Sequence, residues 1–127
     1  MRERISSLNP TDARARDRVA YALATLAGFH QRAGDTAAAF REFERAARIY
    51  GDARAHGDQK LQTLWTLAAA EFGLARIEKG RGHRAAACQH YRRAASLYHE
   101  QEARVPLYPN QKPKAEEARR EASGCGG

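Results

Sequence analysis

Residues 34–50 read GDTAAAFREFERAARIY, and residues 82–98 read GHRAAACQHYRRAASLY. Laid over one another, the two stretches share the glycine, the triple alanine, an Arg-Ala-Ala and the final tyrosine, while Phe43 falls on Tyr91. The small and aromatic residues recur at spacings of three and four, which is typical of one face of a helix. The sequence therefore predicts two equivalent helices that face equivalent neighbours.

Glycines and prolines divide the rest of the chain into further helical segments. Alanine is abundant, only four residues are proline, and runs of β-branched residues are missing, so the composition favours helix. Gly34-Asp35 ends one helix and caps the next, and Asn9-Pro10 does the same near the start. Helices are expected over residues 10–33, 36–54, 58–79, 83–104 and 114–122, and residues 1–8 are expected to end an earlier helix.

These helices predict a single all-α domain over residues 1–127. Residues 10–57 are expected to form a first hairpin and residues 58–104 a second. The two hairpins should stack, because a lone hairpin cannot bury its apolar face. The helix over 58–79 is apolar nearly all round, so we expect it in the middle of the stack. Residues 105–127 are expected to be a Pro-rich link, a short helix and a flexible tail. The predicted architecture is two stacked antiparallel helical hairpins plus a short C-terminal helix.

The repeated stretch resembles the second helix of the tetratricopeptide repeat. In that family a Gly-Asp-like turn precedes a small residue, a large aromatic residue and a small residue at spacings of four and three. The matching positions are Gly34, Ala39, Phe43 and Ala46, and again Gly82, Ala87, Tyr91 and Ala94. The resemblance covers residues 10–104, and it departs from the family in a period of 48 residues where 34 is usual. It implies a tetratricopeptide-like superhelix with longer helices, acting as a protein-binding scaffold.

A narrower resemblance is to the C-terminal repeat regions of some bacterial serine/threonine kinases. Asn9-Pro10-Thr11-Asp12 and the ending from Ala87 to Cys125 carry it. The signatures of a kinase domain, namely a Gly-rich phosphate loop, His-Arg-Asp and Asp-Phe-Gly, are missing from the sequence. The resemblance thus implies a detached regulatory module or a stand-alone relative. We expect no catalytic residue and no cofactor.

The two cysteines predict neither a metal site nor a disulfide framework. Cys88 and His90 stand two apart on a helix and so face different ways, and we expect Cys88 to pack as a small apolar residue. Cys125 is expected on the loose tail. No segment approaches the length of a membrane span, and the start lacks an apolar signal core. These features predict a cytoplasmic protein in a reducing compartment.

The formal charge of +7 bears on the kind of partner. A basic surface attracts nucleic acid, anionic lipid or acidic peptides. The basic residues are not interleaved with aromatic residues as in nucleic-acid-binding surfaces, so a protein partner is favoured. A basic helical nucleic-acid-binding protein remains the alternative hypothesis.

The candidate binding surface is the concave face that the first helices of the stacked hairpins would form. Aromatic side chains beside arginine and lysine would suit a peptide with apolar and acidic side chains. The candidate peptide-binding residues are Tyr21, Gln31, Arg32, Trp65, Phe72, Arg76 and Lys79. Trp65 and Phe72 can equally be core residues. Val19, Leu23, Leu26 and Phe29 form a broader stripe than one partner helix covers, which predicts a homodimer through the N-terminal hairpins.

Overall fold

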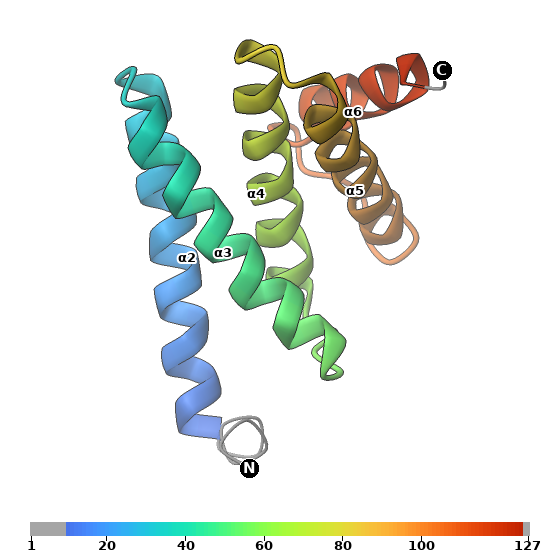
Figure 1. The fold of residues 1–127 in the computed structure, drawn as a ribbon. Coiled ribbons are helices and arrows are strands. Elements are labelled where there is room, and N and C mark those ends of the chain that lie inside the picture. Colours follow the sequence, from blue (N-terminus) through green and yellow to red (C-terminus); the bar gives the residue numbers. More distant parts are fainter. Residues whose placement is uncertain (1–9, 126–127) are drawn as a thin grey trace.

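The structure is a computed structural model that describes residues 10–125, and every element within that range is helical. The elements are α2 (Pro10–Arg32), α3 (Thr36–Ala55), α4 (Leu61–Gly80), α5 (Arg84–Glu102) and α6 (Lys112–Gly124), as Figure 1 shows. The helix end expected over residues 1–8 and the cap at Asn9 lie outside the described residues. The all-α prediction is confirmed. Within the described range, no helix has the length and apolarity that crossing a bilayer requires.

The helices pack in chain order as two antiparallel hairpins followed by a crossing helix. Packing contacts join α2 to α3, α3 to α4, α4 to α5 and α5 to α6. In Figure 1, α4 lies between the first hairpin and α5, and α6 crosses behind α5. The prediction that the apolar helix α4 occupies the middle of the stack is thus confirmed.

The turns inside the two hairpins have the same geometry. Gly34 and Gly82 both adopt the left-handed backbone region, with φ of 87° and 81°. The N–H of Asp35 donates to the carbonyl of His30 at 2.8 Å, and the N–H of His83 donates to the carbonyl of Glu78 at 2.9 Å. Such bonds satisfy the last carbonyls of a helix, and glycine adopts the required backbone without a steric penalty. The sequence repeat therefore encodes a structural repeat.

The repeated small and aromatic residues of α3 and α5 pack in the core on either side of α4. Ala39, Ala46, Ala87 and Ala94 are all buried, as are the aromatic side chains that stand between them, Phe43 and Tyr91. The ring of Phe43 lies directly over Gly73 of α4, where a Cβ atom would approach it to 2.5 Å. Small residues thus let α3 and α4 approach closely, and one aromatic residue fills the remaining space.

The joint between the hairpins differs from the sequence prediction. The third helix was expected from residue 58, but α4 begins at Leu61. The Asp58 carboxylate accepts a hydrogen bond from the N–H of Lys60 at 2.9 Å, and Lys60 is extended. A local side-chain bond of this kind competes with the first helical turn. Asp58 therefore closes a turn before the helix starts.

The C-terminal end is more ordered than the sequence suggested. α6 is four residues longer than the expected helix over 114–122, and a disulfide joins Cys125 to Cys88 with their Cα atoms 5.9 Å apart. The expectations of a flexible tail as far as Cys125, and of two unpaired cysteines, are wrong. The chain folds back so that α6 crosses α5, which brings together sulfurs that are 37 positions apart in the sequence.

Candidate functional site

A groove of about 930 Å³ runs between α2 and α4, the first helices of the two hairpins. Thr36 and Phe43 of α3 contribute to its lining, and Lys114 of α6 closes one edge. This is the face on which the sequence placed a binding surface. Its volume falls in the range of typical small-ligand and side-chain pockets.

The floor of the groove is apolar. Phe72, which is 6% exposed, lies edge-on to Tyr91, with the ring centroids 6.2 Å apart. Gly73, Ile77 and Phe43 continue the floor along α4 and onto α3. Phe72 is therefore a core residue of which only a small part reaches the groove.

Positive side chains line the walls of the groove. Arg32, Arg76, Arg81 and Lys114 all contribute to the lining, and among the described residues no aspartate or glutamate does. Each arginine lies over an aromatic ring: Arg32 over Phe29 at 5.2 Å, Arg76 over Phe72 at 5.8 Å and Arg81 over Phe40 at 4.5 Å. Stacking restricts the guanidinium groups, so less freedom is lost when they bind a carboxylate.

Two glutamates lie just outside the groove and pair with its arginines. Glu117 of α6 approaches Arg76 to 3.3 Å, and Glu78 approaches Arg81 to 3.8 Å. Glu117 also accepts a hydrogen bond from the Tyr91 hydroxyl at 3.2 Å. Burial, reinforced by the nearby Glu117 charge, raises the pKa of Tyr91 well above its ordinary value, so this phenol stays a neutral donor.

The structure brings four of the seven predicted site residues to the groove. Gln31 and Arg32 lie there on α2, and Phe72 and Arg76 lie there on α4. Ala24, Gly28 and Ala69 line the same groove. One side of α2 and one side of α4 therefore line the groove together.

The other three predicted residues lie elsewhere. Tyr21 is exposed and belongs to a separate shallow pocket with Gln62. Trp65 is half-buried and packs edge-on against Tyr108, with the ring centroids 5.5 Å apart. Lys79 pairs with Glu121 of α6 at 2.7 Å. Tyr21 and Trp65 precede the groove-lining residues of their helices, which begin at Ala24 and Ala69. Lys79 forms its ion pair with α6 and does not line the groove.

Sequence reasoning missed other residues of the groove lining, including Thr36, Phe43, Gly73, Arg81 and Lys114. Arg81 follows Arg76 and Ile77 by about one helical turn, so its helical spacing was an available signal. No sequence pattern could have placed Lys114 in the groove, because its position depends on the path of the link before α6.

The candidate metal ligands have other partners. Cys88 is bonded to Cys125, and the Nδ1 atom of His90 lies 2.6 Å from a carboxylate oxygen of Glu71. Over residues 10–125, no three side chains of the metal-binding types gather around one point. The described part of the chain therefore offers no coordination site.

Comparison with known proteins adds no further constraint on function. No family model, no curated protein and no solved structure matches this chain. The geometry of the groove is therefore the basis on which a function is assigned.

Proposed function

We propose that this protein is a non-enzymatic interaction scaffold whose groove binds a protein segment carrying acidic and apolar side chains. In this proposal the hairpins are a long-helix variant of the tetratricopeptide repeat in a cytoplasmic protein. The observation that carries the proposal is the lining of the groove, in which three stacked arginines and a lysine surround an apolar floor.

Both parts of the lining favour the same ligand. An apolar side chain on the floor removes water from around the arginines, which strengthens their attraction to nearby carboxylates. The arginines carry several donors each and can accept carboxylates in more than one orientation. A segment with aromatic or aliphatic residues between glutamates would satisfy the floor and the walls together.

A labelled peptide, Glu-Glu-Phe-Glu-Glu-Leu-Glu-Glu, tests the proposal by fluorescence anisotropy. The double substitution Arg32→Gln with Arg76→Gln removes two groove cations. We expect about fivefold weaker binding, since two exposed pairs at about 0.5 kcal/mol each amount to about 1 kcal/mol. The matched control is Arg41→Gln with Arg48→Gln, which removes the same charge from exposed positions outside the groove lining. Equal losses in the two variants would show that only net charge attracts the peptide.

A duplex DNA probe separates this proposal from the nucleic-acid alternative. Binding through scattered lysines and arginines must weaken steeply as salt rises. We therefore expect only feeble binding to DNA at about 0.15 M salt, near physiological ionic strength. Duplex binding that is tighter than peptide binding in that buffer would favour the alternative.

A further inference from the structure

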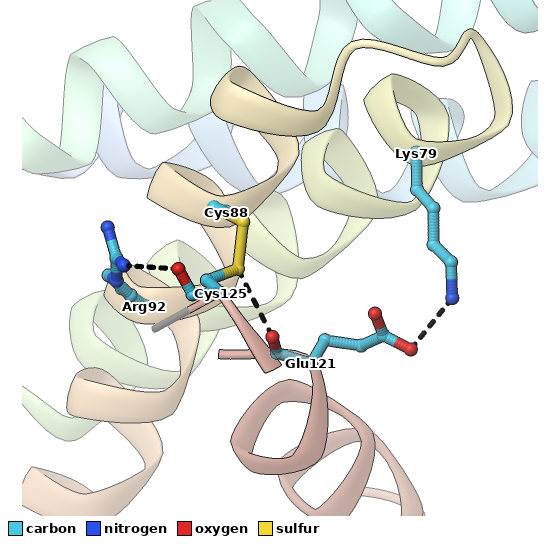
Figure 2. The surroundings of a disulfide bond; sticks show 5 residues. All are labelled: Lys79, Cys88, Arg92, Glu121 and Cys125. Atoms are coloured by element: carbon cyan, nitrogen blue, oxygen red, sulfur yellow. Dashed lines mark hydrogen bonds and ion pairs between the residues drawn. A yellow bond between two sulfur atoms is a disulfide. The ribbon is translucent and has the colours of Figure 1, made fainter. Parts of the chain in front are cut away.

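The Cys88–Cys125 disulfide lies at the surface beside a pocket of about 490 Å³. Both cysteines are half-buried and line this pocket. Figure 2 shows the bond joining α5 to the end of α6, with Arg92 and Glu121 close by. A small thiol reactant can therefore approach the sulfurs.

Positive side chains outnumber negative ones around the disulfide. Lys79, Arg84 and Arg120 line the same pocket together with Glu121, and Arg92 donates a hydrogen bond to the Cys125 carbonyl at 3.4 Å. Thiol–disulfide exchange proceeds by attack of a thiolate and departure of a thiolate. Positive side chains attract the first and stabilise the second, so this environment favours exchange.

The two halves of α6 are held by different contacts. In the first half, Ala115 and Ala118 are fully buried, and Gln111 exchanges two hydrogen bonds with the buried Gln101. In the second half, the ion pairs Arg119–Glu102 and Lys79–Glu121 are exposed or partly exposed. Exposed pairs contribute little, and the last turn includes Ser123 and Gly124, which are weak helix formers. The disulfide is thus the strongest constraint on the second half.

We propose that the Cys88–Cys125 disulfide is an exchange site for a dithiol reductant, and that opening it releases the second half of α6 from α4 and α5. One thiolate of the reductant attacks a disulfide sulfur and forms a mixed disulfide, while the other cysteine leaves as a thiolate and takes up a proton. The second thiol of the reductant then attacks the mixed disulfide. The reductant becomes a disulfide, and both cysteines become thiols.

Release frees a cation beside the binding groove, and this step rests on the proposed function. Glu121 forms an ion pair with Lys79, as Figure 2 shows. Lys79 follows Arg76 by three positions on α4, which is close to one helical turn. When the second half of α6 departs, Lys79 becomes available to a carboxylate of the bound peptide. Arg76 keeps its partner Glu117, which belongs to the half that stays docked. The disulfide therefore regulates whether Lys79, which lies outside the groove lining, is available to a ligand beside the groove.

Hydrogen exchange with mass spectrometry on the full chain tests the release without any ligand. We expect dithiothreitol to accelerate exchange of the amides of residues 119–125 about tenfold or more, because they then open locally. The amides of α3 should not change and serve as the internal control. The variant Cys125→Ser should exchange rapidly with or without reductant. Unchanged exchange over 119–125 after verified reduction would overturn the proposal.

Peptide affinity then tests the regulation. The labelled glutamate-rich peptide should bind about two- to fivefold more tightly to the reduced protein, as expected for one added exposed ion pair. Lys79→Gln should remove that gain while the exchange response to reduction persists. Accelerated exchange with unchanged affinity would overturn the regulatory half of the proposal. No peptide binding in either redox state would overturn the proposed function instead, while the exchange result still decides the release.

Discussion

The two hairpins carry the same pattern but bury it to different extents. With the 48-residue period, Val19, Leu26 and Phe29 of α2 correspond to Leu67, Leu74 and Ile77 of α4. The three α2 residues are 47%, 45% and 61% exposed, whereas the three α4 residues are 6%, 2% and 5% exposed. The inward-facing alanines, in contrast, are buried in both hairpins, as Ala27 and Ala75 show.

The difference comes from the neighbours and not from the pattern. α4 packs against both α3 and α5, so two sides of it are covered. The corresponding outer side of α2 has no helix against it among residues 10–125. An apolar stripe in a repeat therefore shows where a neighbour fits, and the position in the stack decides whether that neighbour is present.

The largest expected effect contrasts the two leucines at equivalent positions. Leu74→Ala should lower the free energy of unfolding by about 2–5 kcal/mol, because it leaves a cavity among Phe43, Ala27 and Ile77. Leu26→Ala removes a side chain that is already half-exposed, so it should change the free energy of unfolding by less than about 0.5 kcal/mol. Urea titrations of both variants provide the measurement. Similar losses would mean that α2 is covered in solution.

The next prediction tests whether the buried alanines of α3 and α5 have equivalent roles in the core. Ala46→Leu and Ala94→Leu should each cost about 1–3 kcal/mol, because both alanines are fully buried where helices approach closely. The matched controls are Ala37→Leu and Ala85→Leu, which stand at equivalent exposed positions of α3 and α5. Thermal melts in which the buried and exposed pairs behave alike would contradict the repeat-based core.

The sequence predicted the core of the two hairpins better than the position of α6. The repeat places Phe43 and Tyr91 in the core, because their spacing to small residues follows the helical period. The position of α6 is different, since it depends on the link over residues 105–111. The buried Leu107 and the Gln101–Gln111 hydrogen bonds fix that link. These are long-range contacts with no local periodicity, so the disulfide and Lys114 could not be predicted.

A smaller effect concerns the joint between the hairpins. The Asp58 carboxylate accepts hydrogen bonds from Arg16 of α2 at 3.2 Å and from Thr63 of α4 at 3.1 Å. Burial alone would raise its pKa, but hydrogen bonds from Lys60 and Thr63 outweigh burial and lower the pKa below its ordinary value. Asp58→Asn should therefore destabilise the protein by about 1 kcal/mol at neutral pH.

The stabilisation by the Asp58 carboxylate should depend on pH. Because the pKa of Asp58 is lowered in the folded state, its stabilisation is present above the unfolded pKa of about 3.9 and is lost as pH falls through the folded value. The difference between wild type and Asp58→Asn should shrink below about pH 4. Thermal melts between neutral and acidic pH measure it. A difference independent of pH would show that the charge of Asp58 is irrelevant.

The smallest expected effect is association through the uncovered stripe of α2, defined by Val19, Leu26 and Phe29. These side chains recur with a heptad-like spacing, so the α2 helices of two copies can pack across a two-fold axis, as in most small oligomers. Arg18 and Arg32 are exposed beside the stripe and bring like charges together in such a pair. We therefore expect a weak homodimer that higher salt strengthens, since salt screens the repulsion.

Light scattering after size exclusion, with the disulfide intact, measures this association. Leu26→Ser with Phe29→Ser should give a monomer, whereas Tyr108→Ser should leave the dimer unchanged, because Tyr108 is a comparably exposed aromatic residue away from α2. A wild-type monomer at every accessible concentration would contradict the homodimer. Dimers that weaken with salt would point to ion pairs instead of the α2 stripe, since apolar contacts do not lose strength as charges are screened.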